Sequence, residues 1–95
     1  MKLLMIIVDA ARGYDVEAIL DSEHVGGYTE LPAVLGKGEH GRKEGTRAFP
    51  GSSAMYLAAI APDKCDAIAD ELRALRDAHP KHGIHAYGFD MTPLL

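Results

Sequence analysis

The sequence has only one cysteine, Cys65, so no disulfide can form within the chain, and a lone thiol is consistent with a reducing compartment. It also lacks an excess of positive charge, because ten Lys and Arg residues stand against fourteen Asp and Glu residues, for a net charge of −4. A general nucleic-acid binder would carry a basic face. The apolar run Leu3–Val8 is too short for a membrane span or a signal sequence. We therefore expect a cytoplasmic protein that binds no nucleic acid and does not insert into membranes.

Catalytic patterns are absent as well. We find no Ser-His-Asp or Cys-His arrangement, and no pair of carboxylates at a spacing typical of general acid and base catalysis. We therefore expect a protein that is not an enzyme. The 95 residues, 47% of them apolar, predict one domain over residues 1–95 with a long loop at about 32–52. A chain of this length buries a modest core, so an oligomer would add stability.

Hydrophobic periodicity and turn residues predict six elements. The apolar run at 2–9 is typical of a strand buried on both faces, and Asp15 is placed as the N-cap of a helix that ends near Glu23. The next strand either ends at Pro32, which lacks the amide donor that a central strand needs, or lies at an edge of the sheet. The second helix carries Cys65, Ile68, Leu72 and Leu75 on one apolar stripe. The predicted order is strand 2–9, helix 15–23, strand 28–31, strand 53–60, a helix from 61 that stops before 80, and strand 84–91.

This order, with right-handed crossovers, predicts an α/β (α+β) ferredoxin-like βαββαβ sandwich in which both helices cover one face of an antiparallel sheet. The opposite face of such a sheet must also be covered. Because the strands at 2–9 and 53–60 are apolar on both sides, we expect another subunit to pack against it.

The segment Leu35–Arg47, between the second and third strands, combines glycines, whose backbone can adopt positive φ, with positively charged side chains. Backbone amides at glycine turns and Arg or Lys side chains together form anion-binding sites. The alternative is a flexible connection that does nothing by itself, but long loops in small domains are usually functional. The glycines are Gly36, Gly38, Gly41 and Gly45, and the cationic residues are Lys37, Arg42, Lys43 and Arg47.

The element order and four short motifs resemble the PII signal-transduction family. The motifs are Asp15-Val16 at the first helix, Gly27-Tyr28-Thr29 in the second strand, Gly36-Lys37-Gly38, and Gly41-Arg42-Lys43-Glu44-Gly45. The resemblance implies a homotrimer that binds an adenine nucleotide (ATP, ADP or AMP) or a similar small anion in a cleft between subunits. It also implies nitrogen regulation through a partner protein bound by the loop. The ligand-binding residues it implies are Thr29, Gly36, Lys37, Gly38, Gly41, Arg42, Lys43 and Arg47.

The five histidines support an alternative hypothesis, a metal-binding or metal-responsive trimer of the CutA kind that binds a divalent metal. In the loop, His40 follows Glu39 and is the candidate metal ligand. His79, His82 and His85 recur every third residue across the end of the second helix. Pro80 and Gly83 interrupt that stretch, so we expect three exposed turn histidines that share no face.

Overall fold

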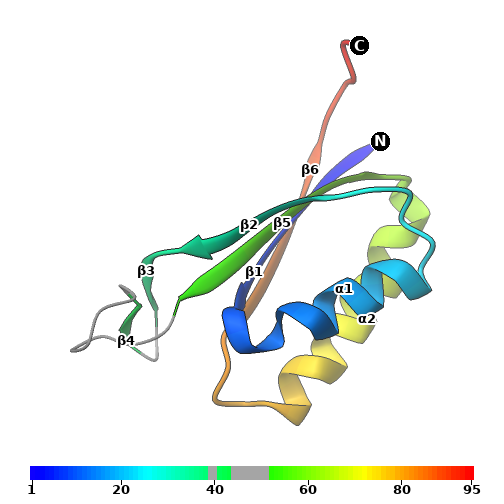
Figure 1. Cartoon of the computed structure of the whole chain (residues 1–95). Helices are drawn as coiled ribbons and strands as arrows, with labels where there is room; N and C mark the ends of the chain where they lie inside the picture. The colour runs from blue at the N-terminus through cyan, green and yellow to red at the C-terminus, as the bar shows by residue number, and fades with distance from the viewer. Residues whose placement is uncertain (39–40, 44–51) are drawn as a thin grey trace.

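A computed structural model of the chain describes residues 1–38, 41–43 and 52–95. Six of the elements form the body of the molecule, and a short two-stranded ribbon extends from it (Figure 1). The elements are β1 (Lys2–Asp9), the 3-10 helix η1 (Ala10–Arg12), α1 (Gly13–Ser22), β2 (Thr29–Val34), β3 (Gly36–Gly38), β4 (Gly41–Lys43), β5 (Ser53–Ile60), α2 (Pro62–Ala78) and β6 (Ile84–Asp90).

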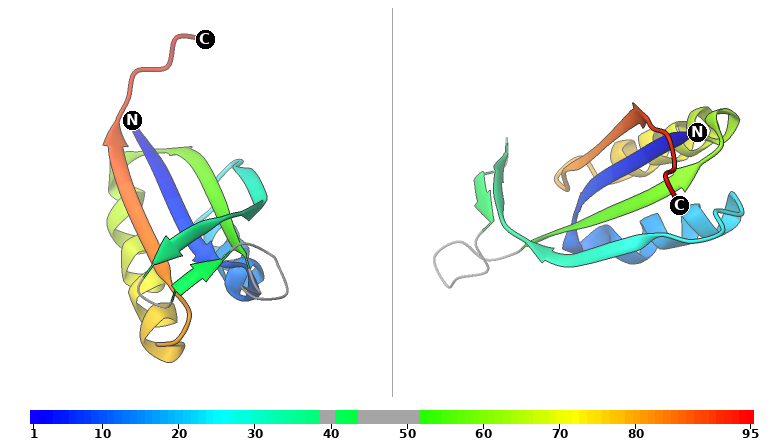
Figure 2. Two further views of the ribbon diagram at one scale, coloured as in Figure 1. Left: turned by 90° about the vertical axis from the view of Figure 1, so that its left-hand side faces the viewer. Right: turned by 90° about the horizontal axis from the view of Figure 1, so that it is seen from above.

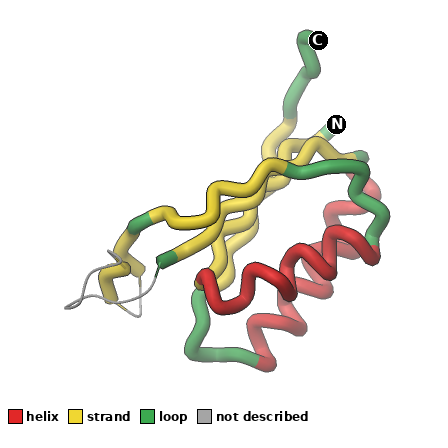
Figure 3. The backbone as a smooth tube through the Cα atoms, in the orientation of Figure 1, coloured by secondary structure: helices red, strands yellow, loops and turns green. Residues whose placement is uncertain are grey.

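The four long strands form one antiparallel sheet in the order β2-β5-β1-β6, with β2 and β6 at its edges (Figure 2). Both helices lie on the same face of this sheet, as the tube drawing in Figure 3 makes plain. The predicted ferredoxin-like βαββαβ sandwich is therefore confirmed. The edge position of β2 also explains how Pro32 is accommodated within a strand, since an edge strand needs hydrogen bonds on one side only.

The start of α1 differs from the prediction. Asp15 lies inside the first turn of the helix, and the residue at the N-cap position is Arg12, which makes no side-chain capping bond. Asp9 instead caps η1, because its Oδ1 accepts a hydrogen bond from the amide of Ala11 at 2.9 Å. An aspartate at the end of a strand can bond the backbone two residues ahead and turn the chain. The turn therefore begins six residues earlier than the predicted cap.

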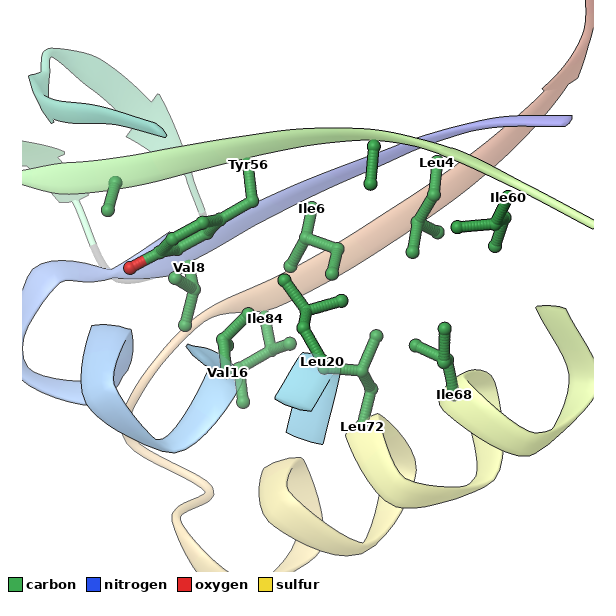
Figure 4. Close-up of a cluster of buried hydrophobic side chains, with 12 residues drawn as sticks. Leu4, Ile6, Val8, Val16, Leu20, Tyr56, Ile60, Ile68, Leu72 and Ile84 are labelled. Carbon is green, nitrogen blue, oxygen red and sulfur yellow. The ribbon is translucent and has the colours of Figure 1, made fainter. Parts of the chain in front are cut away.

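The core lies between the sheet and the two helices (Figure 4). Alternate residues of β1 and β5 point into it, which matches the two-residue period of a strand. The helices contribute one apolar stripe each, as predicted for α2. The twelve buried hydrophobic residues are Leu4, Ile6, Val8, Val16, Leu20, Ala54, Tyr56, Ala58, Ile60, Ile68, Leu72 and Ile84.

The opposite face of the sheet, which we call the open face, is apolar but only partly covered. Its residues form rows across three strands, for example Met5 of β1 between Leu57 of β5 and Tyr87 of β6. Tyr87 is 50% exposed and the β1 residues are half-buried. Burial of β1 and β5 on both faces therefore requires the second subunit that the sequence predicts, and it stays a prediction. The open face comprises Leu3, Met5, Ile7, Thr29, Leu31, Met55, Leu57, Ala59, His85, Tyr87 and Phe89.

Candidate functional site

Several connections meet at one end of the sheet. The amide of Asp9, at the end of β1, donates to the carbonyl of Gly83 at 2.9 Å, and the amide of Ala10 donates to the carbonyl of Ser52 at 3.0 Å. Val34, at the end of β2, is paired with Ser53 at the start of β5. The chain therefore leaves β2 and enters β5 at the same end of the sheet as the segment that joins α2 to β6, with the end of β1 between β5 and β6 (Figure 1).

The described parts of the glycine-rich segment form a ribbon of β3 and β4, which the sequence did not predict. In this ribbon Lys37 lies opposite Arg42, Gly36 opposite Lys43 and Gly38 opposite Gly41. The pairing therefore brings six of the predicted ligand-binding positions into one antiparallel ribbon. Lys37 is exposed. Cross-strand pairing of this kind is a non-local contact, and the glycines give it no alternating pattern that sequence analysis could detect.

Thr29 lies apart from the ribbon. It is exposed at the start of β2, five residues before Val34, so about 17 Å of strand separate it from the end of β2. The structure therefore does not bring Thr29 and the ribbon together within one chain. Arg47, the remaining predicted anion ligand, and His40, the predicted metal ligand, lie outside the described residues. In the described part of the chain, no three His, Cys, Asp or Glu residues are placed to hold a metal ion.

The segment that joins α2 to β6, residues His79–Gly83, is attached to the start of α1 through Arg12. Arg12 Nη1 lies 3.1 Å from His79 Nε2 and 3.2 Å from Asp15 Oδ2. The His79 and His82 rings stack with their centroids 6.0 Å apart and an interplanar angle of 14°. Both histidines are half-buried, and only His85 is exposed, on the open face. The prediction of three exposed turn histidines is therefore wrong for His79 and His82.

A second polar cluster attaches β2 to α1. The hydroxyl of Tyr56 lies 3.0 Å from Glu17 Oε2, 3.0 Å from Glu30 Oε2 and 3.3 Å from the carbonyl of Gly13. Tyr28 donates to the other Glu17 oxygen at 3.1 Å, and its ring meets the Tyr56 ring edge to face. Burial, and then the bonds to Glu30 and Glu17, raise the pKa of Tyr56, so the phenol remains protonated and can donate.

Sequence reasoning missed this cluster because it assigned Tyr56 only an apolar, strand-forming role. One signal was present: a tyrosine in an apolar strand brings a hydroxyl into the core, and a buried hydroxyl needs a hydrogen-bond partner. The cluster holds the strand that leads into the glycine-rich ribbon, since Glu30 belongs to β2 and Glu17 to α1. It therefore supports the base of the candidate site.

A four-stranded antiparallel sheet with two helices on one face and a basic, glycine-rich arm at one end defines a ferredoxin-like α/β sandwich. The chain belongs to the nitrogen regulatory protein P-II family, whose model matches residues 1–87. No curated protein sequence matches the chain.

Solved structures agree with this assignment. CPII, a nitrogen regulatory PII-like protein from Thiomonas intermedia K12 bound to ADP, AMP and bicarbonate, is 26% identical, with a TM-score of 0.72 over 93% of this chain and 86% of that one. CPII bound to ADP and bicarbonate is 27% identical, with a TM-score of 0.71 over the same shares of the two chains. A putative PII-like signaling protein from Thermus thermophilus shares the fold at 17% identity, with a TM-score of 0.68 over 93% of this chain and 83% of that one.

Proposed function

We propose that this P-II family protein is a homotrimeric regulator that binds a small anionic ligand between subunits and signals its bound state to a partner protein through the segment around residues 32–52. The ligand class is an adenine nucleotide, ADP or AMP before ATP, with or without bicarbonate. Proteins of this family are generally regulatory and not enzymatic. The cytoplasm is the compartment in which such a regulator of nitrogen metabolism acts.

The observation that carries the proposal is the position of the basic ribbon. Lys37, Arg42 and Lys43 belong to a glycine-rich ribbon that leaves the sheet at the same end as the His79–Gly83 segment. Backbone amides and guanidinium groups are the usual ligands of phosphate and carboxylate groups. CPII, whose fold this chain shares, binds ADP, AMP and bicarbonate. Similar anions therefore suit the ribbon.

Two features support a site between subunits. Thr29 lies too far along β2 to join the ribbon of its own chain, but a neighbouring chain could supply it. The open face leaves apolar rows such as Met5, Leu57 and Tyr87 for a neighbour to cover. A closed cyclic trimer would repeat the same contact three times.

Calorimetric titration with ADP, AMP, ATP and bicarbonate tests the proposal. We expect saturable binding of ADP or AMP, weakened in Arg42→Ala by about 1.5–3 kcal/mol because a charged hydrogen bond to the ligand is lost. Arg73→Ala is the matched control, since Arg73 lies on α2 and pairs with Asp70 at 2.7 Å. Absence of binding by all four ligands, or equal losses in both variants, would contradict it.

A metal-responsive trimer finds no support among the residues that the structure describes. The same protein can be titrated with copper, zinc and nickel ions while its melting temperature is followed, because a metal bound to the native state raises that temperature by mass action. We expect no shift from any of the three ions. A shift that His40→Ala abolishes would favour the metal hypothesis instead.

A further inference from the structure

The contact between Arg12 and His79 joins two elements that are far apart in the sequence. Arg12 ends η1, and His79 is the C-cap residue of α2. The contact joins Arg12 Nη1 to His79 Nε2 at 3.1 Å. A guanidinium group has donors and no acceptor, so His79 Nε2 must be the acceptor. His79 therefore makes this bond only when Nε2 carries no proton.

The surroundings of His79 determine what a second ring proton would do. Arg12 of η1 contacts the ring nitrogen, His82 stacks on the ring, and Asp15 of α1 lies 3.2 Å from the same Nη1 of Arg12. Arg76 and Asp77 of α2, together with Lys81, are the charged residues closest to His79 along the chain. Protonation of His79 would replace a hydrogen bond with two cationic groups at contact distance. The carboxylate of Asp15, which contacts the same Nη1, offsets part of this repulsion.

Two further buried atoms favour exposure of the His79–Gly83 segment to water once the Arg12–His79 contact is lost. Arg12 Nε and His82 Nδ1 are buried without a hydrogen-bond partner in the described part of the chain. A buried polar atom without a hydrogen-bond partner lowers the stability of the closed arrangement. On exposure, the same atom would form a hydrogen bond with water. The closed arrangement therefore depends on the Arg12–His79 bond to hold these atoms in place.

We propose that the Arg12–His79 contact is a pH-operated tether, closed while His79 is neutral and open once it is protonated, and that it holds the His79–Gly83 segment at the end of the sheet from which the glycine-rich ribbon leaves. His82 donates its amide to the His79 carbonyl at 3.0 Å, and Gly83 accepts from Asp9 at the end of β1. The first of these bonds lies within the segment, so the segment is attached to η1 through Arg12 at one end and to β1 through Gly83 at the other. Because histidine is in general the side chain that changes charge between about pH 5 and 8, this is the pH range over which the tether is tested.

Amide hydrogen exchange on the intact protein tests the tether directly. Exchange is followed at the amides of Asp9 and His82, which bond into the segment, and is corrected for the intrinsic effect of pH. We expect the opening equilibrium at these amides to rise about tenfold from pH 8 to pH 5.5 as a charged hydrogen bond is lost. An opening equilibrium that does not change with pH would overturn the proposal.

Matched variants separate this histidine from the others. Glutamine keeps an oxygen acceptor for Arg12 and does not titrate, so His79→Gln should remove the pH dependence and keep the segment closed. His24→Asn removes a different, exposed imidazole at a position with φ of 57°, which asparagine tolerates, and should leave the pH dependence as in the parent protein. A pH dependence that survives His79→Gln would contradict the tether.

Nitrogen NMR of the His79 ring tests the tether without any substitution. We expect the Nδ1–H tautomer at pH 8, because Nε2 accepts from Arg12. The Nε2–H tautomer would contradict the tether.

The effect on ligand binding rests on the proposed function. If ADP binds, its affinity should fall with acidification in the parent protein by more than in His79→Gln. If ADP does not bind, the exchange and NMR measurements still decide whether the tether exists.

Discussion

At the scale of single residues, the packing around Tyr56 explains a glycine that helix propensity alone would not favour. Gly13 begins α1 with an ordinary helical φ of −56°, so its backbone conformation does not require glycine. A Cβ at this position would lie 2.9 Å from the Tyr56 hydroxyl. That hydroxyl is fixed by Glu17 and Glu30. The glycine is therefore needed for close approach of the helix to β5.

We predict that Gly13→Ala destabilises the protein although alanine is the better helix former. Propensity favours alanine by about 1 kcal/mol, but overpacking costs about 1–3 kcal/mol and here also displaces the Tyr56 hydroxyl. Urea unfolding should therefore show a lower free energy of unfolding. Gly88→Ala is the control, because no atom lies within 4 Å of its Cβ position. A Gly13→Ala protein more stable than its parent would refute the close approach.

At the scale of elements, the contact between α1 and α2 includes two acidic residues. Burial first, and then the side-chain hydrogen bond with Glu23, raise the pKa of Glu71 above its ordinary 4.5. Glu71 Oε2 is buried without a hydrogen-bond partner in the described part, and Glu71 Oε1 lies 3.4 Å from Ser22 Oγ. The folded protein therefore holds a proton on Glu71 more tightly than the unfolded chain does.

The sign of the resulting pH dependence follows from linkage. A raised pKa in the folded state adds stability that is fully present below pH 4.5 and is lost as pH rises through the folded value. At pH 7 the ionised Glu71 therefore costs stability. We predict that Glu71→Gln melts a few degrees higher than the parent at pH 7 and that the gain shrinks at pH 4. An equal gain at both pH values would exclude Glu71 titration as the cause.

The elements also show what local sequence patterns reveal. The strands at Lys2–Asp9 and Ser53–Ile60 match their predictions at both ends, because long apolar runs bounded by polar residues define them. Sequence analysis missed η1. It placed the helix cap at Asp15, whereas Asp9 caps η1 at the end of β1. The β3–β4 ribbon was missed because glycine pairs such as Gly38 and Gly41 carry no strand pattern. Local sequence patterns therefore predict the long strands of the sheet better than they predict the β3–β4 ribbon.

The candidate site was predictable in composition but not in its contacts. The charge and glycine content of Gly36–Lys43 are visible in the sequence, and so is their family resemblance. The contacts of Arg12 with His79 and of Tyr56 with Glu30 join residues 67 and 26 positions apart. Pairings over such separations depend on how the helices cross the sheet. A single sequence does not carry that information.

At the scale of the whole molecule, the open face is an apolar surface that the described helices do not cover. The described helices lie on the other side of the sheet, and Tyr87 and Phe89 of the open face are 50% and 47% exposed. An apolar surface of this kind is typical of a subunit interface. The proposed trimer would bury it.

We predict that Met5→Glu breaks the trimer, because a carboxylate at the centre of the open face would be buried without a partner. Light scattering should report a lower mass while circular dichroism keeps the signal of the fold. Tyr14→Glu is the control, since Tyr14 is 88% exposed on α1. A parent protein that is already monomeric, or a trimeric Met5→Glu, would contradict the interface.

In the described residues, no helix is long and apolar enough to cross a membrane.

The central claim, a ligand site shared between subunits, is tested most directly by mixing two defective chains. Thr29→Val and Arg42→Ala should each weaken ADP binding in a uniform trimer. If Thr29 and Arg42 meet across a subunit boundary, a trimer refolded from an equal mixture should regain about one intact site in four. Calorimetry would then show a tight class of sites that neither variant has alone. A mixture that binds only as the average of its two components would contradict a shared site.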